Sequence, residues 1–274
     1  MDKFKICSAW VDLVAKNTET ALATAQGCIF TYTLDKYYPM KVIILSTICA
    51  LVSSVANADN SKYYVELYGY RYDEPSVMTK NSETLFLSLG FQDYGKDGVV
   101  SVIGNGRYFY GTTKYDSTSS GTTNGDLTFG YLLEAAFKWT INDINVFTGL
   151  GYRTLYDDWG GKKSSTGHWS YDRESKYVYL PIGYIDYLEN NGYFKIQYNY
   201  LLEGKQTSYA GYLGGSHRDT INTQNSGYGF DVEYSPDLNY SVFLRYWDIE
   251  DSNVVNNIYE PNNTTVELGY KYLF

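Results

Sequence analysis

The sequence has little cysteine and little histidine, and its three cysteines are confined to the first 58 of its 274 residues. Cys7, Cys28 and Cys49 all precede Ala58, and there are only two histidines in the whole chain. The part after Ala58 therefore offers neither a disulfide pair nor a thiolate ligand set. We expect no bound metal and no cofactor there.

Long hydrophobic runs are also lacking, and the mean hydropathy is −0.36. The apolar stretch 42–52 is shorter than the roughly 20 residues that a spanning helix needs. It follows Lys41 and precedes Ala56-Asn57-Ala58, which is the layout of a secretory signal-peptide helix with an A-x-A cleavage site.

This layout divides the chain into three parts. We interpret 40–58 as the signal peptide, with Ala56 and Ala58 forming the cleavage site and cleavage after Ala58. Residues 59–274 are then the mature domain, which we expect to be the barrel. Residues 1–39 lie upstream of Met40, a second possible start. We expect this upstream segment to be the product of a mis-assigned start, or else disordered.

Positive charge is scarce as well. The first 58 residues hold five of the 22 basic residues and four of the 31 acidic ones, which leaves 17 basic against 27 acidic residues in the mature part. Nucleic-acid binding surfaces are basic, so this balance argues against a nucleic-acid partner.

What the mature part does contain is alternation, most clearly in its last ten residues. Val266, Leu268, Tyr270, Tyr272 and Phe274 form an apolar row, and the residues between them are mostly polar. Because side chains alternate across a strand, this pattern predicts a strand with one face in lipid and the other in a polar interior.

The same alternation recurs along the mature part and predicts ten strands, with eight as the alternative. We expect them at 63–72, 84–92, 99–110, 126–139, 144–156, 173–188, 193–203, 227–235, 240–249 and 265–274. The gaps between them are alternately short and long. This rhythm predicts an all-β, transmembrane, antiparallel up-and-down β-barrel with long surface loops at 75–83, 111–125, 157–172, 204–226 and 250–264.

These features resemble the bacterial outer-membrane β-barrel proteins. In that superfamily an aromatic C-terminal strand ending in Phe is the assembly signal, so the resemblance assigns this role to Tyr270, Tyr272 and Phe274. It implies a location in the outer membrane, contact with its lipid and lipopolysaccharide, and insertion by the barrel-assembly machinery. The segment 171–184, which follows Gly149-Leu-Gly-Tyr-Arg153, resembles the central hairpin of small opacity-type or porin-family barrels.

Strand parity also predicts which charged residues face the lumen. We expect six acids and six bases there: Glu66, Arg107, Glu134, Lys138, Arg153, Lys195, Glu203, Asp231, Glu233, Arg245, Glu267 and Lys271. A pore selective for one sign of ion would carry a ring of one sign. The balanced set favours a plugged or very narrow lumen held by ion pairs, with an open channel as the alternative.

Catalytic residues are hard to find. His168 and Ser170 form a His-x-Ser pair, with Glu174 close by in the sequence, and this resembles the pair of outer-membrane lipid A deacylases. We expect a non-enzymatic surface protein that serves in interaction, adhesion or envelope integrity, with an extracellular ligand left unnamed. A small solute porin is the first alternative, and an outer-membrane enzyme such as a deacylase is the second.

Overall fold

The computed structural model describes residues 62–93, 99–189, 192–215, 217–237 and 239–274. The expected signal peptide with Ala56 and Ala58, the upstream segment 1–39 and the three cysteines all lie outside these residues. Among the residues that are described, no helix is long and apolar enough to cross a membrane.

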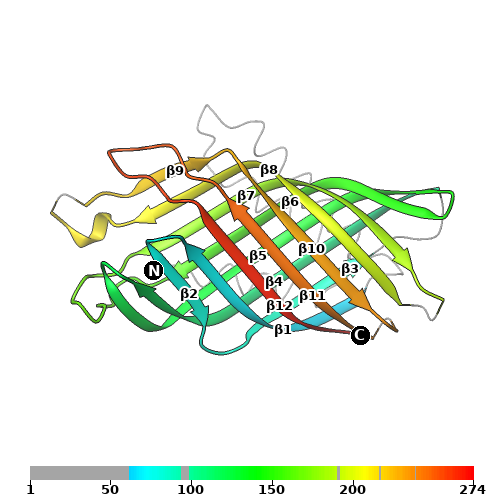
Figure 1. The fold of residues 1–274 in the computed structure, drawn as a ribbon, viewed down its shortest axis with the longest axis horizontal. Helices are drawn as coiled ribbons and strands as arrows, with labels where there is room; N and C mark the ends of the chain where they lie inside the picture. Colours follow the sequence, from blue (N-terminus) through cyan, green and yellow to red (C-terminus); the bar gives the residue numbers. More distant parts are fainter. Residues whose placement is uncertain (1–61, 94–98, 190–191, 216, 238) are drawn as a thin grey trace, which may run out of the picture. The chain divides into compact units, whose positions relative to one another are not determined.

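The described residues form a single antiparallel sheet (Figure 1). Its strands are β1 (Lys62–Glu74), β2 (Met78–Ser82), β3 (Phe86–Asp93), β4 (Val100–Ser117), β5 (Gly121–Ile141), β6 (Ile144–Asp158), β7 (Asp172–Tyr187), β8 (Tyr193–Tyr209), β9 (Thr220–Gln224), β10 (Gly227–Ser235), β11 (Tyr240–Ile249) and β12 (Asn263–Leu273). A single 3-10 turn, η1 (Gly211–Leu213), is the helical element of the described chain.

The sheet closes on itself because β12 pairs with β1 from Tyr64 opposite Leu273 to Asp73 opposite Thr264. The ends are joined as well, since the amide of Phe274 donates to the carbonyl of Tyr63 at 2.9 Å. A closed barrel leaves no free strand edge. The predicted antiparallel barrel is confirmed.

The described wall contains ten strands, although twelve segments are counted. Both β2 and β3 pair with β1 and β4, at successive positions along the same line of the wall. They are therefore two halves of one wall strand. In the same way β9 and β10 both pair with β8 and share one position in the wall. The ten-stranded prediction is therefore confirmed, and the eight-stranded alternative is wrong.

The strands show two chemically different faces. The outer face carries exposed apolar side chains, which include Leu67, Leu89, Phe137, Ile196 and Leu268. The side chains between them point inward and are buried, and many of them are charged. This inversion, with an apolar exterior and a polar interior, is what a barrel surrounded by lipid requires.

Glycines let large rings fit inside the wall. At Gly130, Gly151, Gly183 and Gly269, a Cβ atom would overlap a ring or the Cβ of an aromatic residue that is directly opposite on the neighbouring strand. The partners are Phe109, Tyr179, Phe147 and Tyr68 respectively. Small residues opposite large ones therefore allow a ten-stranded wall to be packed internally.

Three of the expected surface loops contain long stretches of strand. β4 and β5 continue to Ser117 and from Gly121, so 111–125 is a hairpin with a short turn rather than a loop. β2 lies within 75–83, and β8 and β9 occupy about half of 204–226. These segments are polar on both faces because they lie beyond the apolar band, so hydrophobic alternation disappears while strand pairing continues.

Candidate functional site

The lumen is the first place where charged residues meet. Eleven of the twelve residues predicted to face it do so, each with little or no exposure: Glu66, Arg107, Glu134, Lys138, Arg153, Lys195, Asp231, Glu233, Arg245, Glu267 and Lys271. They come from β1, β4, β5, β6, β8, β10, β11 and β12. Strand parity was therefore sufficient to locate them.

Glu203 is the exception, and its predicted inward position is wrong. The register of β7 with β8 shifts at this point, with Val178 opposite Glu203 but Tyr179 opposite Leu201. The additional residue, Leu202, forms a bulge that reverses the parity of the rest of β8. Glu203 consequently lies on the outer face, with a third of its side chain exposed and Lys205 at 3.5 Å.

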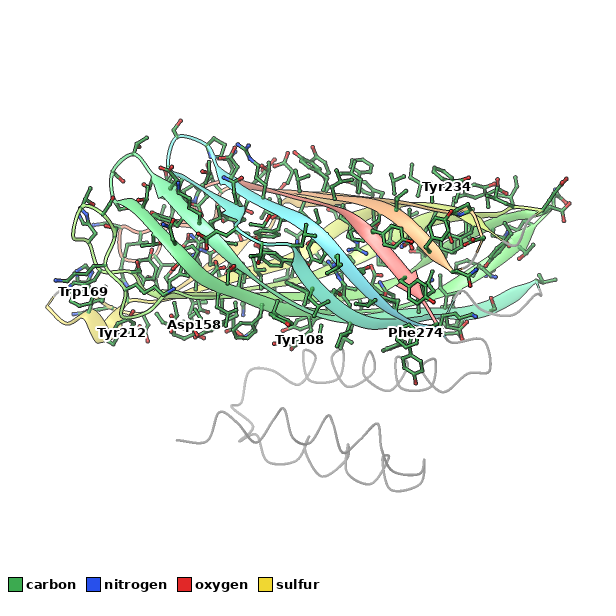
Figure 2. The ribbon with its side chains drawn as sticks, turned by 90° about the horizontal axis from the view of Figure 1, so that it is seen from below. Tyr108, Asp158, Trp169, Tyr212, Tyr234 and Phe274 are labelled. Carbon is green, nitrogen blue, oxygen red and sulfur yellow. The ribbon has the colours of Figure 1, made fainter. Side chains whose placement is uncertain are left out.

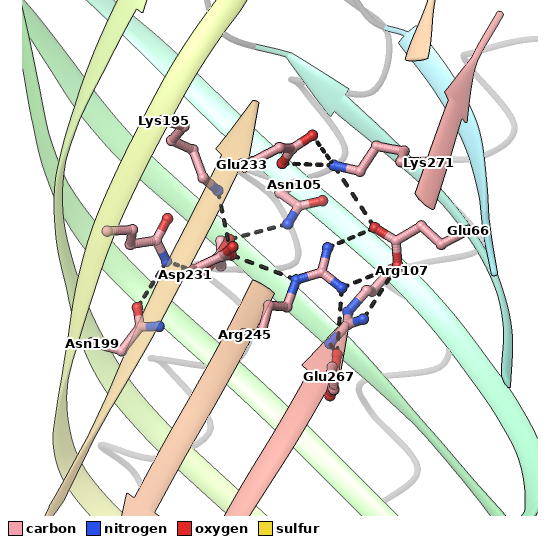
Figure 3. A network of polar contacts seen from close by, with 12 residues as sticks. Glu66, Asn105, Arg107, Lys195, Asn199, Asp231, Glu233, Arg245, Glu267 and Lys271 are labelled. Atoms are coloured by element: carbon pink, nitrogen blue, oxygen red, sulfur yellow. Dashed lines mark hydrogen bonds and ion pairs between the residues drawn. The ribbon is translucent and has the colours of Figure 1, made fainter. Parts of the chain in front are cut away.

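The centre of the lumen holds two glutamates surrounded by guanidinium groups (Figure 3). Glu66 accepts from Arg245 at 2.6 Å and from Arg107 at 3.3 Å. Glu267 accepts from Arg107 at 2.9 Å and from Arg153 at 3.1 Å. The three arginines come from β4, β6 and β11, and the two glutamates come from β1 and β12. These bonds therefore cross the barrel and join strands that do not pair with one another.

A second set of contacts extends this central cluster toward the periplasmic end. Lys271 contacts Glu233 at 2.7 Å and Glu66 at 3.7 Å. Lys195 reaches Asp231 at 3.5 Å, and Arg245 reaches the same carboxylate at 3.6 Å. Each buried charge in this layer thus has an oppositely charged neighbour, as burial of charge requires.

Glu134 is held differently. Its carboxylate accepts hydrogen bonds from Tyr179 at 2.9 Å, Gln197 at 2.7 Å and Asn105 at 3.1 Å, all of them neutral donors. It also lines a cavity of roughly 20 Å³, which has about the volume needed to admit one water molecule. This cavity is too small to be a solute path.

Aromatic rings fill the lumen on the extracellular side of the ion pairs. The rings of Tyr68 and Tyr70 pack against Phe86, with centroids 5.5 and 4.8 Å apart. The guanidinium groups of the cluster lie on rings of this layer, with Arg245 3.8 Å from the centre of Phe243. Rings and ion pairs together close the barrel, which agrees with the predicted plugged lumen.

A further buried network lies nearer the extracellular end, in segments that we expected to be loop. Lys80 pairs with Asp157, which also accepts from Thr128 at 2.8 Å. Arg173 donates to Glu74 at 2.8 Å. These residues were not among those predicted to face the lumen. Inward parity continues from Tyr72 to Glu74 along β1, so the same pattern would place Glu74 inside.

The residues considered for catalysis do not come together. His168 Nδ1 lies 2.9 Å from Thr166 Oγ1, in the loop after β6. Glu174 accepts from Lys176 at 2.7 Å and from Tyr209 at 2.9 Å on the outer face of β7 and β8. The main-chain oxygen of Ser170 accepts from Tyr212. Among the hydrogen bonds of the described residues, none joins these three side chains into a relay.

Metal ligands do not gather either. The described residues contain no group of three or more His, Cys, Asp or Glu that could hold an ion. The carboxylates of the lumen instead contact cations of the protein itself.

The extracellular rim is ordered and carries exposed rings. Trp169 is 54% exposed and Tyr212 is 55% exposed, and the two lie at the same end of the barrel, opposite Phe274 (Figure 2). The Lys163 ammonium lies 4.5 Å from the centre of the Trp169 ring. The hydroxyl of Tyr212 donates to the carbonyl of Ser170 at 2.7 Å, which joins the two loops.

The loop between β11 and β12 is also fastened to the wall. Ser208 donates to Glu260 at 2.9 Å, and Asn222 donates to the carbonyls of Asn253 and Ile258 at 2.9 and 3.0 Å. Burial raises the pKa of the Glu260 carboxyl, although the charge of Arg173 and the bond from Ser208 oppose this effect.

An apolar band around a closed antiparallel barrel, with an even number of strands in the described wall, is the architecture of bacterial outer-membrane proteins. The chain is an outer-membrane β-barrel protein. The exposed C-terminal rings of Tyr270, Tyr272 and Phe274 lie on the lipid-facing side, where the assembly signal of such barrels is expected.

Comparison with known proteins adds little to this conclusion. No family model matches the chain, and no curated protein matches it. Among solved structures, the attachment invasion locus protein Ail of Yersinia pestis has a TM-score of 0.34 at 12% identity, covering 78% of this chain and 97% of that one. The translocator domain of autotransporter NalP from Neisseria meningitidis has a TM-score of 0.36 at 13% identity, covering 85% and 95%.

Outer membrane phospholipase A from Escherichia coli is also similar, with a TM-score of 0.30 at 10% identity, covering 81% of this chain and 96% of that one. Likenesses at this level do not bear on activity. The architecture rests on the strand pairing and on the two faces of the wall.

Proposed function

We propose that the protein is a non-conducting outer-membrane barrel that acts through its extracellular rim as a surface interaction protein. The observation that carries this proposal is the filled lumen. Glu66 and Glu267 each bind guanidinium groups from two different strands, so the ion pairs cross the whole interior. A rigid, closed barrel of this kind presents its rim rather than transporting a solute.

The rim supports the second half of the proposal. The long strands β4, β5, β7 and β8 extend beyond the apolar band and provide a rigid base for the loops. Trp169 and Tyr212 are exposed on that base and held by hydrogen-bonded loops. Rigid exposed aromatics supply contact area at a low cost in conformational entropy, and for this reason they are common in protein-binding surfaces.

Planar-bilayer recording tests the closed lumen. We expect no stable conductance steps from the purified barrel. The double variant Arg245→Ala/Trp247→Ala serves as a positive control, because it removes a bridging cation and a buried ring from the lumen. Stable steps in the unaltered protein would favour the porin alternative and overturn the proposal.

Adherence measurements test the rim. Cells of a non-adherent strain that display the protein are compared on mucin-coated, matrix-coated and bare surfaces. We expect adherence to at least one coated surface, and we expect Trp169→Ala/Tyr212→Ala to lower it. Tyr108→Ala is the control, because Tyr108 is equally exposed but lies on the lipid-facing wall (Figure 2). Equal adherence of all variants and of cells without the protein would contradict an interaction role.

A further inference from the structure

The outer face of the wall carries a short row of basic and amide side chains on β1, β2 and β4. Arg71 lies directly opposite Asn81, and Asn81 lies directly opposite Lys114. Their neighbours Tyr72, Lys80 and Thr113 are buried in the lumen, so the three residues of the row face outward. With strands about 4.8 Å apart, the backbones of Arg71 and Lys114 are separated by roughly 10 Å, a distance that their long side chains can bridge.

This row lies at the extracellular border of the apolar band. The outward residues on its periplasmic side are Leu67, Leu85 and Tyr110, which are 47%, 61% and 45% exposed. Between them and the row, the hydroxyls of Thr84 and Thr112 lie 3.2 Å apart at the surface. Five polar side chains therefore meet the membrane at the level where acyl chains end and headgroups begin.

The charge of the row is only partly compensated. Lys114 takes part in no ion pair among the described residues, whereas Arg71 pairs with Asp73 at 3.6 Å and keeps 58% of its side chain exposed. Asp73 and Asp116 flank Thr79 one row farther from the membrane, so they are not level with the two cations. The carboxylate of the nearby Glu83 accepts from the amide of Gly125 on β5 at 2.6 Å and takes part in no ion pair among the described residues.

Another pair of cations on the wall provides a comparison. Lys176 and Lys205 are directly opposite each other on β7 and β8, also on the outer face. There each ammonium has its own carboxylate, with Glu174 at 2.7 Å and Glu203 at 3.5 Å. Both cations of that pair are compensated, whereas in the row on β1, β2 and β4 Lys114 has no carboxylate partner among the described residues.

We propose that the Arg71–Asn81–Lys114 row is a docking site for the phosphate groups of an outer-leaflet lipid whose acyl chains lie along Leu67 and Leu85. A phosphate oxygen can accept from the guanidinium, the amide and the ammonium at the same time. The positive row also complements an anionic leaflet, in a mature part that otherwise carries an excess of acids.

Native mass spectrometry of the detergent-solubilised full barrel tests the site. The probes are bisphosphorylated lipid A, the same lipid without phosphates, and inorganic phosphate. We expect the phosphorylated lipid to bind the unaltered protein most tightly. Binding falls roughly fivefold on removing either cation and on the order of 20-fold in R71Q/K114Q. The charge-preserving variant R71K/K114R keeps most of the affinity.

The matched control is K176Q/K205Q, which also removes two cations from the outer face, each of which has its own carboxylate partner. It is expected to bind as the unaltered protein does. Equal losses in the two double variants would show unspecific attraction and overturn the proposal. So would tight binding of the dephosphorylated lipid, or displacement of the lipid by inorganic phosphate at comparable concentration. Heat-modifiable migration in gels confirms that each variant is folded, and the single variants carry the test if the double variant is not.

Discussion

Gly151 on β6 lies directly opposite Tyr179 on β7, and the tyrosine ring occupies the space that a side chain at residue 151 would need. The ring is fully buried, and its hydroxyl donates to Glu134 at 2.9 Å. The missing side chain therefore lets the ring lie flat against the wall and reach a carboxylate on β5. Gly183 and Phe147 show the same relationship on the same two strands, nearer the periplasmic end.

Replacing Gly151 with Ala is expected to destabilise the barrel by about 1–3 kcal/mol, because the new methyl group would overlap the fully buried Tyr179 ring and force it to move. Urea unfolding in lipid vesicles, followed by gel migration, measures the change. Gly69→Ala is the control, since a Cβ at Gly69 meets nothing nearer than a carbonyl oxygen at 4.0 Å. Equal stability of the two variants would show that the ring can move aside.

Removing the charge of Glu66 is expected to have a larger effect. The variant Glu66→Gln keeps the shape of the side chain but leaves Arg107 and Arg245 with less negative charge nearby. Breaking one partner of a buried ion pair costs about 3–5 kcal/mol. The same urea experiment applies, with Glu203→Gln as the control because Glu203 is on the outer face and partly exposed. A change below about 1 kcal/mol for Glu66→Gln would mean that the cluster is well hydrated.

The wall and its two faces could be predicted from alternation, because the physical demand is strict. A residue that faces lipid must be apolar, so Leu268 and Tyr270 identify the outer face, and Glu267 and Lys271 must then be inside. The partners of these charges could not be predicted. The bonds from Glu267 to Arg107 and Arg153 depend on how the wall curves, which no local pattern records.

The errors also have physical causes. Leu202 is an additional residue in β8, so the parity reverses beyond it and Glu203 was assigned to the wrong face. The layer of Lys80 and Asp157 was missed because strands beyond the membrane no longer need an apolar face. Without that requirement the sequence loses its alternation, and extended strands resemble polar loops.

The raised pKa of Glu260 predicts a pH dependence in the loop that it fastens. A carboxyl with a folded-state pKa above its unfolded value binds its proton more tightly when folded. The loop 250–262 should therefore gain stability as the pH falls through that raised pKa toward the ordinary value of 4.5, and lose it as the pH rises. Hydrogen exchange of the loop measures this. Glu260→Gln, which keeps an acceptor for Ser208, is expected to remove the dependence, and an unchanged pH profile in that variant would contradict it.

Phe274 and Leu273 are adjacent at the end of the chain, but we expect them to act at different stages. The ring of Phe274 is 64% exposed to the lipid side, and its backbone supplies the bonds to Tyr63, so Phe274→Ala should change the stability of the refolded barrel little. Leu273 is buried inside, and Leu273→Ala should cost about 2–3 kcal/mol of stability.

The two residues separate folding from assembly. If Phe274 is read by the assembly machinery, Phe274→Ala lowers the amount of barrel inserted in cells although the purified chain refolds as before. Leu273→Ala shows the opposite balance, with normal recognition and weaker folding. Comparing insertion in cells by heat-modifiable migration with urea unfolding of refolded protein distinguishes them. Equal insertion of Phe274→Ala and the unaltered chain would mean that the terminal ring serves only as part of the lipid-facing surface.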